Sequence, residues 1–159
     1  MFITSYKPVL QKNRLMALEP VRDYLCEDGG DVVTSTLAAG RIFVDCVRLH
    51  EEADERMVVL CLNSSGHVTG MFEMTCGSIS AIQFDIAGIL RKVLMMNCVS
   101  FIMAHNHPGG SKCPSCEDLE GTERVKQAAE MLGLRLLDHF IICGPSGEYL
   151  SLREEGYLK

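Results

Sequence analysis

Two histidines, a serine and an aspartate lie within a stretch of fourteen residues and form the part of the chain best suited to chemistry. His105 and His107 are separated by one residue, and Ser115 and Asp118 follow after a short loop. Two imidazoles and one carboxylate, with a fourth position left for water, are the ligands of a hydrolytic zinc site rather than of a closed structural one. The spacing therefore predicts a catalytic Zn²⁺ site with His105, His107 and Asp118 as ligands.

The flanking segments predict how these side chains are positioned. Residues 99–104 are apolar and partly β-branched, which is typical of a buried strand. Side chains two residues apart on a strand face the same way, so His105 and His107 should project together from its end. A Pro-Gly-Gly-Ser loop at 108–111 follows, and Ser115 then has the position of a helix N-cap. The strand end would supply two imidazoles and the helix start a carboxylate.

Each of these residues also has a purely structural interpretation. Ser115 and Asp118 have the spacing of a capping box, and a histidine at a strand end is commonly only a polar terminus. The combination of two histidines, a glycine-rich turn and a Ser-x-x-Asp helix start favours the metal site.

Eight cysteines raise a second possibility for metal binding. Because no signal peptide opens the chain, we expect reduced thiols, most of them acting as small hydrophobic residues. Cys113 and Cys116 differ, since a Cys-x-x-Cys pair beside the histidines could serve redox chemistry or compete with Asp118 for zinc. The absence of a second such pair in the sequence argues against a structural zinc site.

Zinc-dependent nucleic-acid deaminases are the nearest alternative class. They require His-x-Glu and Pro-Cys-x-x-Cys. This chain has His107 at the position of the glutamate, and Pro114 lies between the two cysteines instead of before them. The deaminase interpretation is excluded on both counts.

Length and composition indicate a soluble folded protein. The 159 residues suit one domain, and 47% hydrophobic with 23% charged residues argues against disorder. The net charge of −6 has the wrong sign for direct nucleic-acid binding. With no leader and no apolar run long enough for a membrane span, we expect a cytoplasmic protein without membrane contact.

Hydrophobic periodicity predicts an α/β fold. We expect an N-terminal arm at 1–30, with a possible edge strand at 7–12, and one domain at 31–159. The predicted elements of that domain are a helix at 31–50 interrupted near Gly40, a hairpin of 57–62 and 67–74, a helix from Ile79 to Leu94, a helix from Ser115 to about Leu132, and strands at 134–143 and 149–152.

The motif resembles that of the JAMM (MPN-type) metallopeptidases, which is His-x-His, seven residues, Ser, two residues, Asp. The bacterial RadC branch is the closer match, and the resemblance runs from about Glu55 to the C-terminus. Four segments carry it: Ala104–Pro108, Pro114 to Thr122, Leu137–Ile142 and Tyr149–Glu154. The resemblance implies a single three-layer αβα domain around a mixed sheet, as in JAMM and cytidine-deaminase folds.

The resemblance also implies a mechanism of amide hydrolysis at Zn²⁺. RadC-like chains carry a glutamate eight residues before the asparagine of the hairpin turn, and Glu55 and Asn63 match that spacing. Glu55 would be the general base, ahead of Glu51, Glu52 and Glu73 as alternatives. Ser115 would donate a hydrogen bond to the oxyanion. This role conflicts with pure capping, because one hydroxyl cannot fully serve both tasks.

The pair Asp138-His139 has two open interpretations. It could orient a metal ligand from behind, as residues next to metal-bound histidines commonly do. It could equally be a buried structural pair. The sequence does not choose between them.

Two departures from the RadC pattern bear on substrate contacts. The usual His-Pro-Arg-Glu stretch is Gln83-Phe84-Asp85-Ile86 here, and the loop after His107 is Pro-Gly-Gly-Ser instead of Pro-Ser-Gly-Asp. The chain is also too short for the helix-hairpin-helix region of longer members. No metal ligand is lost, but contacts made by the missing arginine and aspartate are in doubt.

Three functions follow from these observations. The first is a metallopeptidase or isopeptidase acting on a peptide or an isopeptide-linked protein. The second is a DNA-repair-associated protein acting on or near DNA, for which the chain offers no basic stripe or stacking platform. The third is a non-catalytic module that binds a partner, against which the intact set of Glu55, both histidines, Ser115 and Asp118 argues.

Overall fold

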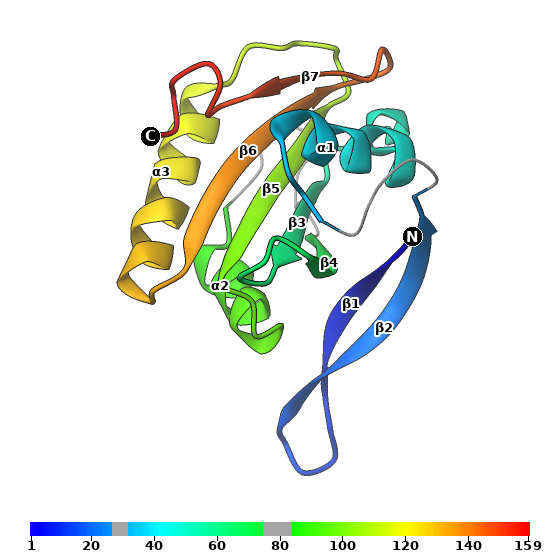
Figure 1. Ribbon diagram of the computed structural model, residues 1–159, viewed down its shortest axis with the longest axis vertical. Coiled ribbons are helices and arrows are strands. Elements are labelled where there is room, and N and C mark those ends of the chain that lie inside the picture. The colour runs from blue at the N-terminus through cyan, green and yellow to red at the C-terminus, as the bar shows by residue number, and fades with distance from the viewer. Residues whose placement is uncertain (27–31, 75–83) are drawn as a thin grey trace.

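The computed structural model describes residues 1–26, 32–74 and 84–159, which form a seven-stranded mixed sheet with helices on both faces (Figure 1). The strand order is β2-β1-β4-β3-β5-β6-β7. In chain order the strands and α-helices are β1 (Phe2–Leu10), β2 (Met16–Leu25), α1 (Thr36–Arg41), β3 (Met57–Leu62), β4 (Val68–Met74), α2 (Ile86–Met95), β5 (Ser100–His107), α3 (Cys116–Met131), β6 (Arg135–Cys143) and β7 (Glu148–Ser151).

The sheet combines hairpins with one crossover that matters for the site. β3 is antiparallel to both β4 and β5. β5 and β6 are parallel, and α3 makes the connection between them. Parallel neighbours need such a crossover, usually a helix, because the end of the first strand and the start of the next lie at opposite edges of the sheet. The loop that leaves β5 therefore leads directly into the first turn of α3.

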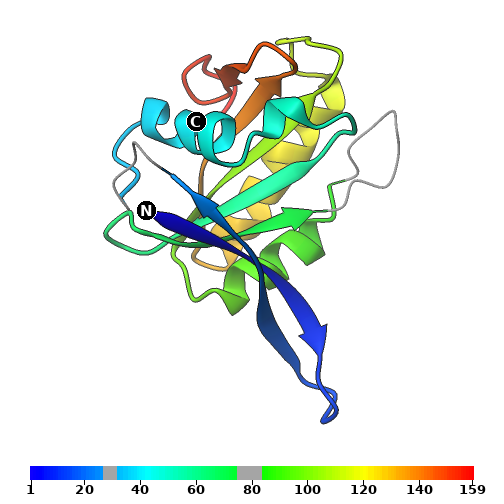
Figure 2. The ribbon, with the colours of Figure 1, turned by 90° about the vertical axis from the view of Figure 1, so that its right-hand side faces the viewer.

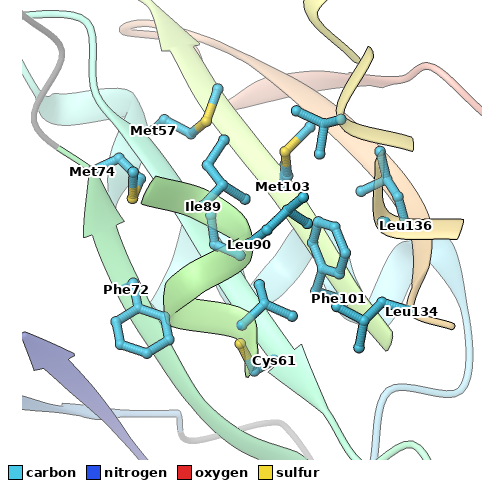
Figure 3. Close-up of a cluster of buried hydrophobic side chains, with 14 of the residues drawn as sticks. Met57, Cys61, Phe72, Met74, Ile89, Leu90, Phe101, Met103, Leu134 and Leu136 are labelled. Atoms are coloured by element: carbon cyan, nitrogen blue, oxygen red, sulfur yellow. The ribbon is translucent and has the colours of Figure 1, made fainter. Parts of the chain in front are cut away.

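Two hydrophobic layers enclose the sheet, which confirms the three-layer αβα prediction. α2 and α3 cover one face, where Figure 3 shows Ile89 and Leu90 of α2 set among Met57, Phe101 and Met103 of the strands. α1 and the turns that follow it cover the other face, with Phe43 and Leu49 packed among residues such as Phe140. Since both faces are covered, all six residues of β3 are buried.

The predicted strands of the domain are confirmed, as is the helix after Ser115. Ser115 is the N-cap of α3, and Gly133, with φ +73°, follows the helix end. The helix predicted from Ile79 begins instead at Ile86, because the Asp85 side chain caps it by accepting a bond from Gly88 N. Ile79 itself lies outside the described residues. Across these residues no helix is both long and apolar enough to cross a membrane.

The helix predicted for 31–50 is interrupted, as expected, but not near Gly40. α1 gives way to a π-helical turn at Ile42–Cys46, Arg48 adopts a left-handed φ of 59°, and a 3₁₀ turn follows at Leu49–Glu51. The break thus lies at Arg48 and not at Gly40. Gly40 is required for packing, because the Tyr149 ring occupies the space of a Cβ.

The N-terminal segment is more ordered than the predicted arm with one edge strand. β1 and β2 form a long antiparallel hairpin that projects beyond the helices (Figure 2), and β1 joins the sheet beside β4 in parallel. The Tyr24 hydroxyl donates to Glu73 Oε1 on β4 at 2.6 Å and so ties the hairpin to the domain. The proposed boundary at residue 30 falls among residues that the structure does not describe, and the division remains a prediction.

The expectation that all cysteines are reduced is wrong for one pair. Cys26 and Cys46 form a disulfide with a Cα–Cα distance of 5.1 Å. Cys26 follows β2, and Cys46 ends the π-helical turn, so the return of the hairpin to the helical layer brings the two together. A pairing across twenty residues that depends on an unexpected strand could not be inferred from cysteine spacing.

We predict that Tyr24 makes the fold sensitive to alkaline pH. Burial, aided by the bond to Glu73, raises the pKa of Tyr24 from 10.0 to about 12. Above pH 10 the unfolded chain releases this proton before the folded one, so stability falls through the window between 10 and 12. The loss should reach about 1.4 kcal/mol by pH 11. Tyr24→Phe should remove it, measured as the difference between the two proteins in denaturant unfolding at pH 9 and 11.

Tyr157→Phe is the matched control, since this tyrosine is 53% exposed. An identical pH slope for Tyr24→Phe and the wild type would contradict the prediction.

Candidate metal centre

The structure brings the three predicted ligands together. His105 and His107 lie at the end of β5, and Asp118 lies in the first turn of α3. Their candidate ligand atoms all lie within 4.8 Å of one another. The two Nε2 atoms are 2.9 Å apart, and Asp118 places Oδ1 3.3 Å from His105 Nε2 and Oδ2 3.4 Å from His107 Nε2. Four atoms thus converge on one point.

Alternation along β5 and a tight loop produce this convergence. Phe101 and Met103 pack on the face covered by α2 and α3, so His105 and His107 continue on that face, toward α3. The loop then turns back on the strand, with the His107 carbonyl accepting from Gly110 N at 2.9 Å. Gly110 has φ +78°, and a Cβ there would meet the Gly144 carbonyl at 3.0 Å, so this turn requires glycine.

The hydrogen bond of His107 assigns its protons. Its Nδ1 lies 3.0 Å from the backbone carbonyl of Ser111, which can only accept. Nδ1 therefore carries the proton and donates. In the neutral ring Nε2 is then a bare lone pair, directed at His105 and Asp118.

A chain of three buried groups assigns His105 in the same way. The Thr122 hydroxyl donates its one proton to the Asp118 carbonyl at 2.6 Å, so it accepts from His139 Nδ1, also at 2.6 Å. His139 Nε2 must then accept from His105 Nδ1, 2.8 Å away. Burial lowers the pKa of His139 well below normal, which keeps this ring neutral. In the neutral ring, His105 therefore also presents a bare Nε2.

Two lone pairs facing each other at 2.9 Å beside a carboxylate require a positive charge between them. His105 is fully buried and Asp118 nearly so, so water cannot screen the repulsion. Burial raises the pKa of Asp118, but the two neighbouring imidazoles and the hydrogen bond from the Ser115 amide favour its charged form and hold that pKa well below its usual range. A shared proton or a metal ion would supply the charge, and the donor set fits a metal ion.

Ser115 and Asp118 form the capping box as well. Ser115 Oγ accepts from Asp118 N at 3.0 Å, and Asp118 Oδ2 accepts from Ser115 N at 2.8 Å. Capping uses a lone pair of the Ser115 hydroxyl and not its proton, so the two roles that seemed to compete in the sequence are compatible. The hydrogen bond from the Ser115 backbone amide also orients the Asp118 carboxylate toward the histidines.

Glu55 lies on the neighbouring chain segment, opposite His107. Met57 pairs with His105 across β3 and β5, and this antiparallel register, continued by two residues, sets Glu55 against His107. The pKa of His107 is raised, chiefly by the Asp118 carboxylate and in smaller part by the Ser111 carbonyl and the negative charge of Glu55. Glu55 is therefore close enough to act on the site electrostatically, although it is not one of the converging ligands.

The three other candidate bases are engaged with arginines. Glu51 pairs with Arg48, and Glu52 with Arg56 at 3.2 Å. Glu73 accepts from Tyr24 and lies 3.5 Å from Arg56, and its β-partner Val58 belongs to the hydrophobic layer away from α3. Over the described ranges Glu55 has no ion pair with lysine or arginine. Of the four candidate bases, Glu55 is thus the one without an arginine partner among the described residues.

Asp138 and His139 have separate roles, because neighbours on a strand face opposite sides of a sheet. The Asp138 carboxylate accepts from the Ser151 hydroxyl at 2.5 Å and from the amides of His139 and Arg153, which joins β6 to β7 and the C-terminal turn. Asp138 is structural, whereas His139 orients His105. The sequence left both interpretations open, and the link through Thr122 was visible only in three dimensions.

Cys113 and Cys116 are free, exposed thiols at the start of α3. Within the described part of the chain the converging group consists of His105, His107 and Asp118 and includes neither thiol. The proposed competition with Asp118 therefore has no support in the geometry.

We predict that the Thr122 hydroxyl tunes metal affinity through His139. Thr122→Val removes the acceptor for His139 Nδ1–H, which favours the other tautomer of His139, with its proton on Nε2. That proton would be donated to His105 Nδ1, so the His105 proton would move to Nε2. Affinity for Co²⁺, measured by competition with a chromogenic chelator, should fall about tenfold. Thr122→Ser keeps the hydroxyl and is the control. Equal affinities in all three proteins would show that the chain of bonds does not govern the metal site.

Comparison with known proteins agrees with this geometry. Residues 33–157 match the family model described as RadC-like JAB domain. A UPF0758 protein of Acidithiobacillus ferrooxidans is 38% identical over 141 residues, covering 87% of this chain and 61% of that protein. A UPF0758 protein of Porphyromonas gingivalis is 42% identical over 104 residues, covering 65% and 45%. The chain thus spans about half the length of these curated relatives. Since the family model matches most of it, the chain belongs to the RadC-like JAB domain family.

Proposed function

We propose that the protein is a zinc-dependent hydrolase that cleaves amide bonds, as a metallopeptidase or isopeptidase. The observation that carries the proposal is the pair of bare Nε2 atoms facing the Asp118 carboxylate, with a free glutamate opposite His107. Nitrogen and oxygen donors of this number and type suit Zn²⁺ and leave a position for water and substrate. Membership of the RadC-like JAB family agrees with hydrolytic chemistry.

Zinc held by His105, His107 and Asp118 would supply Lewis-acid charge, which acidifies water and polarises an amide carbonyl. Glu55 would accept the proton of the attacking water and pass it to the leaving amine. Lacking an arginine partner among the described residues, its carboxylate does not have to break an ion pair to do so. The attacking water and the leaving nitrogen would both have to lie within reach of the Glu55 carboxylate.

Ser115 would stabilise the negative charge that develops on the carbonyl oxygen. Its oxygen is fixed by the bond from Asp118 N, while its proton has no acceptor among the described residues. A fixed donor of this kind at an oxyanion is worth about 3 kcal/mol in other hydrolases. The capping bond thus supports the catalytic role, because it fixes the orientation of the Ser115 side chain.

The substrate we propose is a peptide or an isopeptide-linked protein. The net charge of −6 does not favour a polyanionic substrate, which would be repelled before binding. The complete set of metal ligands, base and hydroxyl also argues against a module that only binds a partner.

The experiment that tests this function separates metal binding from catalysis. Glu55→Gln keeps the size and hydrogen bonding of the side chain but cannot take a proton, so zinc content and melting temperature should stay at wild-type values while kcat falls at least a hundredfold. Asp118→Asn should instead lose zinc, because it removes a ligand and its charge. Zinc is measured by elemental analysis, and activity on a panel of peptides and isopeptide-linked conjugates.

Glu52→Gln is the matched control, since Glu52 lies in the same segment but pairs with Arg56. Loss of zinc in Glu55→Gln would make Glu55 a ligand, and unchanged activity would place the base elsewhere.

A further inference from the structure

We propose that Asn106, the residue between the two histidine ligands, is a positioning residue that fixes Glu55 relative to the metal site. The inference rests on the proposed function for its catalytic consequence, but its structural part can be tested separately. Asn106 alternates with His105 and His107 along β5, so its side chain points to the opposite face of the sheet. It is fully buried there.

The Asn106 amide makes three hydrogen bonds to the backbone of the segment that contains Glu55. Nδ2 donates to the carbonyls of Glu52 and Asp54, at 3.0 and 3.1 Å. Oδ1 accepts from Arg56 N at 2.7 Å. Both donors and one acceptor site are therefore used, and the partners fix which end is nitrogen, because two carbonyls need a donor and an N–H needs an acceptor.

These contacts hold the backbone on both sides of Glu55 and leave its side chain free. The bonded groups belong to the residue before Glu55 and the residue after it. The segment lies between the 3₁₀ turn and β3, outside any helix or strand. Because no regular ladder fixes the carbonyls of Glu52 and Asp54, the Asn106 side chain takes the place of one.

One residue of β5 thus couples two parts of the site. His105 and His107 place the metal ligands on one face, and Asn106, between them, anchors the base from the other face. A shift of β5 moves ligands and base together, so their separation is preserved. Misplacement of a catalytic group by about 1 Å can cost a hundredfold in rate, which is the scale of effect that a lost anchor should have.

Other side chains of similar size cannot replace this amide. Aspartate would set an acceptor against two carbonyl oxygens, and leucine would leave all three backbone groups without a partner. Because the Asn106 side chain lies on the face of the sheet opposite the histidine side chains, it does not act on the metal ligands directly.

The test uses Asn106→Ala in the full chain, with three measurements. Hydrogen–deuterium exchange at the amide of Arg56 should accelerate at least tenfold. Zinc content by elemental analysis should stay at the wild-type level. On the peptide substrate identified for the wild type, kcat should fall about a hundredfold, with a smaller change in KM.

Asn63→Ala is the matched control. Asn63 also fixes a loop through its side chain, by accepting from Ser65 N and His67 N in the β3–β4 turn, away from the metal. It should accelerate exchange in that turn only and leave kcat unchanged. If Asn106→Ala does not fold, Asn106→Ser gives the same comparison, because serine cannot reach three backbone groups at once.

Each other outcome overturns part of the proposal. Unchanged exchange at Arg56 would show that Asn106 does not anchor the segment. Faster exchange with unchanged kcat would make the anchor structural only, and loss of zinc would mean that Asn106 acts through the histidines. A wild type that hydrolyses no amide contradicts the proposed function, and the exchange measurement then still decides the anchor.

Discussion

The two imidazoles of β5 meet through Nε2 atoms 2.9 Å apart, which carry no proton when the rings are neutral, in a buried space closed by a carboxylate. Such a contact is unfavourable unless a positive charge lies within it. The protein nevertheless fixes it firmly, because Ser111 holds the proton of His107 on Nδ1, and His139 with Thr122 does the same for His105. An arrangement that directs lone pairs together at such cost is best explained as a site prepared for a cation.

The rest of the fold can be understood as support for that contact. β5 is an interior strand with apolar layers on both faces, so its end has little freedom to move. The crossover brings Asp118 to the histidines, because the loop after β5 leads into the first turn of α3 beside the strand end. The capping box then orients the carboxylate, so one local motif serves helix stability and metal binding together.

Local sequence patterns predict the metal ligands, whereas contacts between residues far apart in the chain could not be predicted from the sequence. His105, His107 and Asp118 follow from strand alternation and an N-cap, both readable within a few residues. The β1–β2 hairpin was only partly predicted, because β2 is mostly exposed on both faces and so lacks the alternation of a half-buried strand. The bonds of Asn106 and His139 join residues far apart in the chain, and no spacing rule indicates them.

The coordination of zinc tests the central claim most directly. X-ray absorption at the zinc edge of the metal-loaded protein should show only nitrogen and oxygen neighbours at about 2.0–2.2 Å, including the multiple-scattering signal of two imidazoles. His107→Ala should lose that signal with the metal. A sulfur shell at about 2.3 Å would contradict the account, because the metal would then be held by thiolates such as Cys113 and Cys116 instead of by the converging histidines.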